Sequence, residues 1–167
     1  MHPLPCKLET MQRPIRQSLI VDAGRQEVAL FENGLQVAAW PVSTSKFGLG
    51  TEEGSFKTPT GEFLVAEKIG AGCPAWSIFK SRVPTGETAS PGGDEDLVLT
   101  RILWLEGTGP DNTNTRGRYI YFHGTNQEHL IGTPASHGCI RLRNDDMIAL
   151  FDRVAEGTPV EIHAPGA

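Results

Sequence analysis

Glycine and proline recur along the whole chain and leave only short apolar runs between them. The 167 residues include 19 glycines and 12 prolines, and turn residues interrupt residues 70–118 repeatedly. Short strands joined by turns fit this pattern better than long helices do. With 38% hydrophobic residues, a chain of this length fills one core. The sequence therefore predicts a single, mainly β domain with few helices.

The clearest local signal is the pair Asn33-Gly34, which separates two β-rich runs at residues 27–31 and 35–40. This dipeptide favours a type I′ turn and therefore predicts a β-hairpin. Asn144 precedes an apolar-periodic stretch that Gly157 closes, so we expect a helix there with Asn144 as its N-cap. Further strands are expected at residues 18–23, 63–69, 97–105, 118–124 and 158–163.

Charge and targeting signals narrow the classes of partner. The net charge is −5 and no block of like charge stands out, which disfavours nucleic-acid binding. No apolar stretch is long enough to span a bilayer, so no membrane span is expected. Residues 1–17 are broken by prolines and read as an N-terminal extension without a secretory signal. We expect a cytoplasmic location, or a periplasmic one if a leader has been removed.

The cysteines are three in number and widely spaced, at Cys6, Cys73 and Cys139. This pattern supports neither a disulfide framework nor a CxxC zinc site, and free thiols suit a reducing compartment. Cys6 and Cys73 are interpreted as small buried side chains.

The reactive side chains are concentrated between His123 and Asn144, in HGTNQEHLIGTPASHGCIRLRN. A thiol with an ordinary pKa of about 8.5 is only slightly ionised at neutral pH, so a nucleophilic cysteine needs a nearby base. His137 lies two residues before Cys139, whereas a glycine-rich loop can bring His123 back from the end of an earlier strand. Both histidines are candidates from the residues alone.

The residues around Cys139 suit acyl transfer. Gly138 permits a sharp turn and a close approach of substrate, so the N–H groups of Gly138 and Cys139 are candidates for an oxyanion hole. Arg141 offers a fork of donors that fits a carboxylate. A zinc site built from His123, His137 and Cys139 is the alternative, and it would need His129 as a fourth ligand.

The segment SHGCIRLRN resembles the signature of the L,D-transpeptidase catalytic domain, the YkuD-type fold. The upstream HGT at His123, the stretch KTPTGEF at residues 57–63 and the helix after Asn144 fall in the order that this family uses. The resemblance covers roughly residues 18–163. It implies a mainly β, two-sheet sandwich with a helix following the cysteine loop.

The resemblance also implies roles for individual residues. Cys139 would be the nucleophile and His123 the general base. Gly124 stands where some relatives carry serine, so a backbone carbonyl would orient the imidazole. Ser136, His137 and Gly138 would shape the oxyanion site, and Arg141 would bind the substrate carboxylate. Apart from the resemblance, Tyr121 is expected to border the site because it shares a strand face with His123, and Trp76, bounded by glycine and proline, is a candidate for a lid. Neither a cofactor nor a metal is implied.

The expected substrate is a peptidoglycan tetrapeptide stem. Family members attack the carbonyl of its third, L-configured residue, release the terminal D-alanine and leave a thioester on cysteine. An amine acceptor then gives transpeptidation, whereas water gives the L,D-carboxypeptidase reaction used in recycling. Carbapenems acylate the same thiol in this family. The rival hypothesis is a catalytically silent peptidoglycan-binding module of the same fold.

Overall fold

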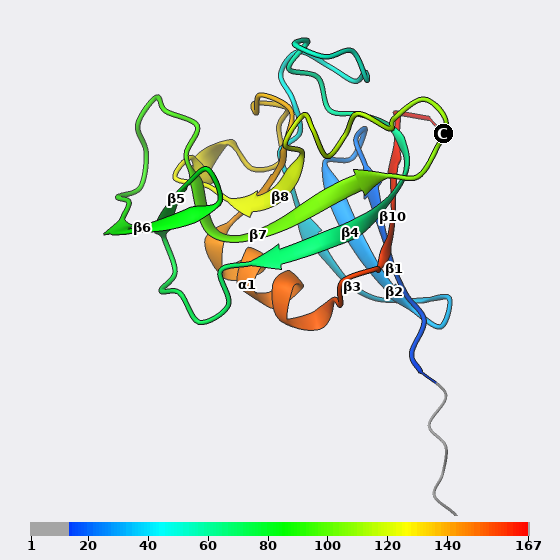
Figure 1. Ribbon diagram of the computed structural model, residues 1–167, viewed down its shortest axis with the longest axis horizontal. Helices are drawn as coiled ribbons and strands as arrows, with labels where there is room; N and C mark the ends of the chain where they lie inside the picture. The colour runs from blue at the N-terminus through cyan, green and yellow to red at the C-terminus, as the bar shows by residue number, and fades with distance from the viewer. Residues whose placement is uncertain (1–13, 167) are drawn as a thin grey trace, which may run out of the picture.

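The computed structural model describes residues 14–166, which form ten strands, one α helix and one short 3-10 helix (Figure 1). Cys6 and most of the predicted N-terminal extension lie outside this range. The elements in chain order are β1 (Gln17–Asp22), β2 (Glu27–Glu32), β3 (Leu35–Pro41), β4 (Gly61–Ile69), β5 (Ser77–Lys80), β6 (Val83–Thr88), β7 (Val98–Gly107), β8 (Tyr121–Gly124), η1 (Glu128–Leu130), β9 (Ile140–Leu142), α1 (Asn144–Arg153) and β10 (Pro159–His163).

One hydrogen-bonded sheet connects all the strands, in the order β3-β2-β1-β10-β4-β7-β5-β6, with β8 beside β7 and β9 beside β8. The strand β7 is the branch point, because β4 and β5 pair with it and so does β8. Most pairs are antiparallel, whereas β1 with β10 and β8 with β9 are parallel. The second parallel pair carries the candidate site.

The sheet curls until its ends approach each other. A bridge joins Ser43, just after β3, to Arg141 in β9 at the far end of the strand order. The enclosed core draws on strands from both halves of the sheet and on α1, which contributes Met147, Leu150 and Phe151. Figure 1 shows α1 lying along one side of the long strands β4 and β7, with β1 to β3 crossing behind them. The two layers expected of a sandwich are therefore two halves of one sheet.

The mainly β class and the helix after the cysteine loop are confirmed, whereas two separate sheets are not found. The strands expected around residues 18–23, 27–31, 35–40, 63–69, 97–105 and 158–163 are present within one or two residues at most ends. The hairpin of β5 and β6 and the short strand β9 were not predicted. Both are short, and turn residues in their surroundings hide any alternation of apolar side chains.

Two local expectations were wrong. Tyr119 was placed on a strand with Tyr121 and His123, but it has a φ of 59° and lies in a turn before β8. The helix begins at Asn144 itself, and Arg143 occupies the N-cap position without a side-chain cap bond. Asn144 does not cap because its side chain is held by Thr100 and Thr125 instead.

Gly34 provides a test of the predicted hairpin. Asn33 and Gly34 have φ values of 52° and 80°, as a type I′ turn requires, and space is open where a Cβ on Gly34 would lie. Gly34→Ala should lower the free energy of unfolding by about 1–2 kcal/mol, because only the left-handed backbone conformation opposes it. Urea unfolding checks this, with Gly117→Ala as control, since Gly117 has no positive φ and only an ordinary contact at 3.7 Å. Equal losses in the two variants would contradict the turn assignment.

Candidate active site

Cys139 lies in a tight turn immediately before β9, and three hydroxyl and amide contacts fix that turn. The hydroxyl of Ser136 donates to the Cys139 carbonyl at 2.6 Å and accepts from the Gly138 N–H at 3.2 Å. Thr58, from the KTPTGEF stretch, donates to the Gly138 carbonyl at 2.8 Å. Gly138 has a φ of 128°, a conformation that side chains disfavour. The sequence between residues 57 and 63 is thus part of the support of the cysteine.

The thiol of Cys139 is held by backbone groups of the chain that leads into β8. Its Sγ lies 3.3 Å from the carbonyl oxygen of Tyr119 and 3.4 Å from the amide nitrogen of Tyr121. The residue remains partly exposed. Burial raises the pKa of the Cys139 thiol to about 12, partly opposed by the hydrogen bond from Tyr121. The resting thiol is therefore neutral.

His123 occupies β8 and is only 2% exposed. Its Nδ1 lies 2.6 Å from the carbonyl oxygen of Gly124. Because a carbonyl only accepts hydrogen bonds, Nδ1 carries the proton and Nε2 is the basic nitrogen. Burial lowers the pKa of His123, although the charge of Asp96 and the Gly124 carbonyl oppose this. The imidazole is neutral at rest and available to accept a proton.

Strand pairing places Cys139 and His123 on the same face of the sheet. Phe122 pairs with Ile140 in the parallel ladder, and both side chains point into the core. Because side chains alternate along a strand, His123 projects to the opposite face, as does Cys139. Within residues 14–166 no hydrogen bond joins the thiol to an imidazole. In the resting structure the two groups share a face and each is bonded to backbone.

Arg141 and His137 converge on Asp96. Arg141 Nη1 lies 3.0 Å from one carboxylate oxygen of Asp96, and His137 Nδ1 lies 3.0 Å from the other. Arg141 is fully buried and also donates to Gln127 at 2.7 Å and to Ser43 at 3.2 Å. The guanidinium that was expected to meet a substrate carboxylate is thus occupied by a carboxylate of the protein itself.

Gly124 is packed so tightly that no side chain fits. A Cβ at this position would collide with the Oδ1 of Asn144 and would lie 3.0 Å from both the Leu99 carbonyl and the Thr100 side chain. Asn144 is itself fixed by a 2.5 Å hydrogen bond from Thr100 and by its own donation to the Thr125 carbonyl at 2.8 Å. The serine expected in some relatives would therefore disturb the backbone that orients His123.

Aromatic side chains line the sheet next to the thiol. Tyr121 packs with Phe79 and Ile102, and Cys139 packs against the same cluster. The tip of the β5–β6 hairpin reaches this wall: Arg82 donates to the Tyr121 hydroxyl at 3.0 Å and stacks over Trp104 at 4.7 Å. Burial raises the pKa of Tyr121, partly opposed by the bond from Arg82. Tyr121 thus lies beside Cys139, at the border of the candidate site.

Trp76, the candidate for a lid, lies directly before β5. Its backbone N–H donates to the Thr100 hydroxyl at 2.9 Å, its carbonyl accepts from the Ala89 N–H at 2.9 Å, and its φ is 69°. These contacts are those of the loop that leads into β5.

Four polar residues next to the site were not predicted from the sequence: Thr58, Arg82, Asp96 and Arg118. They lie in loops, and their hydrogen-bond partners are far away in the sequence.

The described part of the chain contains no group of three or more histidine, cysteine, aspartate or glutamate residues able to hold a metal ion. His129, which the zinc alternative required, is exposed on the short 3-10 helix. Within residues 14–166 no helix has the length and hydrophobicity needed to cross a membrane.

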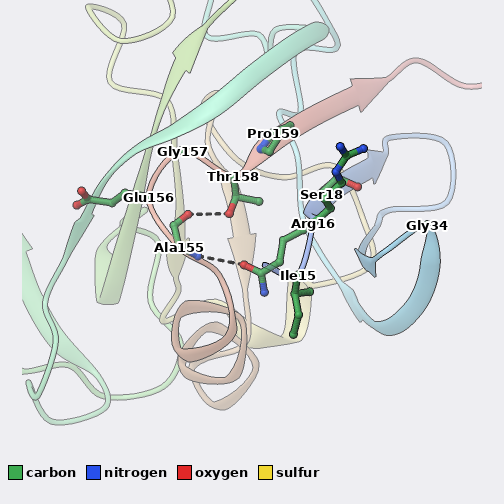
Figure 2. A pocket seen from close by; sticks show the side chains of 10 residues that line it. Ile15, Arg16, Ser18, Gly34, Ala155, Glu156, Gly157, Thr158 and Pro159 are labelled. Carbon is green, nitrogen blue, oxygen red and sulfur yellow. Dashed lines mark hydrogen bonds between the residues drawn. The ribbon is translucent and has the colours of Figure 1, made fainter. Parts of the chain in front are cut away.

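Two hollows on the surface differ in how close they lie to the cysteine turn. Figure 2 shows one of about 500 Å³ beside β1 and β10, where Gln17 and Thr158 bond to Ala155. Its lining contains no cysteine or histidine. A smaller one of about 120 Å³ lies beside the cysteine turn, lined by Glu53, Gly54, Phe56, Arg118, Ile120 and His137. The chemistry favours the smaller hollow, because its wall includes the residue two positions before Cys139.

Fold and site together define a curled β domain in which a cysteine turn and a buried histidine share one face of a parallel strand pair. The sequence model of the L,D-transpeptidase catalytic domain (YkuD) matches residues 16–162. The chain therefore belongs to the L,D-transpeptidase catalytic domain family, which is an enzyme family.

Individual relatives agree with this. The chain is similar to a probable L,D-transpeptidase of Salmonella typhimurium, ErfK/SrfK, at 31% identity over 95% of this chain and 50% of that protein. It is 32% identical to the putative L,D-transpeptidase YqjB of Bacillus subtilis over 86% of this chain and 69% of that protein. The chain thus spans about half to two thirds of the length of these curated relatives.

Solved structures show the same fold at lower identity. An L,D-transpeptidase from Xylanimonas cellulosilytica matches with a TM-score of 0.60 and 21% identity over 91% of this chain and 62% of that one. L,D-transpeptidase 3 from Mycobacterium tuberculosis, solved with a faropenem-derived adduct, matches with a TM-score of 0.58 and 18% identity over 89% of this chain and 60% of that one.

The tight packing of Gly124 can be tested by mutation. Gly124→Ala should lower the free energy of unfolding by about 1–3 kcal/mol, because the new methyl group overlaps Asn144 and the neighbouring strand. Urea unfolding measures this. Gly109→Ala is the matched control, since a Cβ there meets its nearest neighbour at an ordinary 3.5 Å. Indistinguishable unfolding midpoints for the two variants would show that Gly124 has more room than the structure gives it.

The raised pKa of Cys139 predicts a characteristic pH dependence of alkylation. Only the thiolate reacts, so a thiol with a pKa of about 12 should react with iodoacetamide far more slowly at pH 7 than a free cysteine. Its rate should still rise beyond pH 10, where a thiol of ordinary pKa levels off. Mass spectrometry of the peptide that contains Cys139 measures this rate separately from other cysteines. A plateau below pH 8 would contradict the effect of burial.

Proposed function

We propose that this chain catalyses acyl transfer on a peptidoglycan stem peptide, with Cys139 as the nucleophile and His123 as the general base. The observation that carries the proposal is the shared face of the thiol and the neutral imidazole, whose Nδ1 is held by the Gly124 carbonyl. That hydrogen bond leaves Nε2 free to take the thiol proton. Membership of the L,D-transpeptidase family supplies the substrate class.

In the proposed reaction, the Cys139 sulfur attacks the carbonyl carbon of the third stem residue while the thiol proton passes to His123 Nε2. The bond to the terminal D-alanine then breaks, and its nitrogen takes the proton from His123. D-alanine leaves and a thioester remains. An amine or a water molecule attacks the thioester with His123 again accepting a proton, and the thiol is restored. A direct contact between the thiol and the imidazole would form when substrate binds, as resting enzymes often lack it.

The backbone of the cysteine turn would stabilise the negative charge that develops on the carbonyl oxygen. The Gly138 N–H donates to Ser136 over 3.2 Å, and a substrate oxygen could replace this long bond. The N–H of Cys139 makes no turn or loop hydrogen bond in the described range. Ser136 would keep the turn in place through its bond to the Cys139 carbonyl.

The names of the relatives favour an amine as the acceptor, because ErfK/SrfK and YqjB are both named as L,D-transpeptidases. Hydrolysis to a tripeptide uses the same thioester and differs only in the acceptor. The proposal therefore covers both outcomes, and one assay separates them. Carbapenems should acylate Cys139, by analogy with the L,D-transpeptidase LdtMt1, which was solved in complex with imipenem.

Cys139→Ala tests the proposal directly. The protein is mixed with a disaccharide tetrapeptide, with and without added D-methionine, and products are identified by mass spectrometry. The unaltered chain should release D-alanine or exchange it for D-methionine, and Cys139→Ala should reduce both to background because no thioester forms.

Cys73→Ala is the matched control, because Cys73 is also a free, partly buried thiol but lies in the loop between β4 and β5, outside the β8–β9 pair. It should retain most of the turnover. A native circular dichroism spectrum shows that each variant is folded. Binding of the tetrapeptide without any change in mass would support the silent binding module, and equal turnover in Cys139→Ala would overturn the mechanism.

A further inference from the structure

We propose that Asp96 is a positioning residue for this reaction, which clamps the cysteine turn on both sides of the nucleophile and, through Arg141, braces the strand that carries His123. This inference rests on the function proposed above.

Asp96 binds one residue on each side of Cys139 in the sequence. One carboxylate oxygen of Asp96 lies 3.0 Å from His137, two residues before the cysteine, and the other lies 3.0 Å from Arg141, two residues after it. The side chain of Asp96 is 16% exposed, and that of Arg141 is fully buried. A carboxylate that bridges two donors on either side of a residue limits how far the backbone between them can move.

Arg141 links the clamp to the strand that carries the histidine. It pairs directly with His123 in the parallel ladder, and Gln127 and Ser43 hold the same guanidinium group. Asp96 therefore braces both the cysteine turn and the register of the strand beside His123. An uncompensated charge would be left buried if either partner were removed.

The loop that carries Asp96 is itself anchored near His123. The side chain of Asn126 donates to the carbonyls of Gly92 and Glu95, both at 2.9 Å, and accepts from the Leu97 N–H at 3.2 Å. Asn126 lies three residues after His123, and it is buried. The position of the carboxylate is thus set from the same stretch of chain as the imidazole.

The charges around Asp96 are few and can be named. Burial alone would raise the pKa of Asp96, but the charges of His123 and Arg141 and the hydrogen bonds from His137 and Arg141 outweigh it, so its pKa is lowered. The carboxylate is therefore ionised at neutral pH. The charges of Asp96 and Arg141 act on the pKa of His123, and those of Asp96, Arg141 and Arg118 act on the pKa of Cys139.

The charge of Asp96 raises the pKa of His123 and also that of Cys139. As the thiol proton moves to His123, an imidazolium forms beside the carboxylate and is stabilised by it. The same charge disfavours a free thiolate in the absence of substrate. Asp96 thereby favours proton transfer during the reaction over ionisation of the thiol at rest.

Asp96→Asn tests this inference, because asparagine keeps the shape and removes the charge. Release of D-alanine should fall by about ten-fold to a hundred-fold, since the cysteine turn loses its clamp. Glu95→Gln is the matched control. Glu95 is exposed in the same loop, and loss of its charge should leave turnover unchanged. Asp96→Glu retains the charge and should keep the pH dependence of the unaltered chain, even if its turnover falls.

Two measurements that need no substrate separate this role from a merely structural one. Loss of the charge should lower the pKa of His123 in an NMR titration and shift the alkylation profile of Cys139 to lower pH. Loosening of the structure would instead relieve burial and raise the pKa of His123. A raised or unchanged pKa of His123 in Asp96→Asn would overturn the inference. These readouts remain informative even if the unaltered chain releases no D-alanine, which would count against the proposed function alone.

Discussion

The parallel pairing of β8 with β9 is the constraint on which the candidate site depends. It places His123 beside Arg141 and turns Phe122 and Ile140 together into the core. A shift of one residue in either strand would exchange the two faces and bury the wrong side chains. The burial of Phe122 and Ile140 therefore fixes the register, and the register brings the cysteine turn to the face of the histidine.

Two polar networks support this strand pair from different sides. Arg141 joins Asp96, Gln127 and Ser43 on one side, and Asn144 joins Thr100, Thr125 and Glu128 on the other. Buried polar groups are costly unless they are paired, and both networks join residues that are distant in the sequence. The strand pair is thus held by apolar packing on one face and by hydrogen bonds around its edges.

The sequence was informative where the signal is local. Asn33-Gly34 specifies its hairpin through backbone conformation, and the motif around Cys139 marks the candidate nucleophile through its chemistry. Asp96 gave no such signal, because its meaning depends on Arg141, 45 residues away, and on a loop without periodicity. The partner of Arg141 was mistaken for the same reason. A guanidinium group predicts a carboxylate partner, but the sequence does not show whether that carboxylate belongs to the substrate or to the protein.

Under the proposed mechanism, the packing around Cys139 and His123 has a consequence for selectivity. Desolvation raises the pKa of Cys139 and lowers that of His123, so both shifts favour the neutral thiol and neutral imidazole over the ion pair. Under the proposed mechanism, charge would appear only when a carbonyl oxygen occupies the backbone donors of the cysteine turn and the imidazolium forms beside Asp96. A substrate whose carbonyl oxygen fits these donors would stabilise the charged state, whereas an electrophile that does not bind there would not. The low resting reactivity of the thiol would follow from the same packing that orients it.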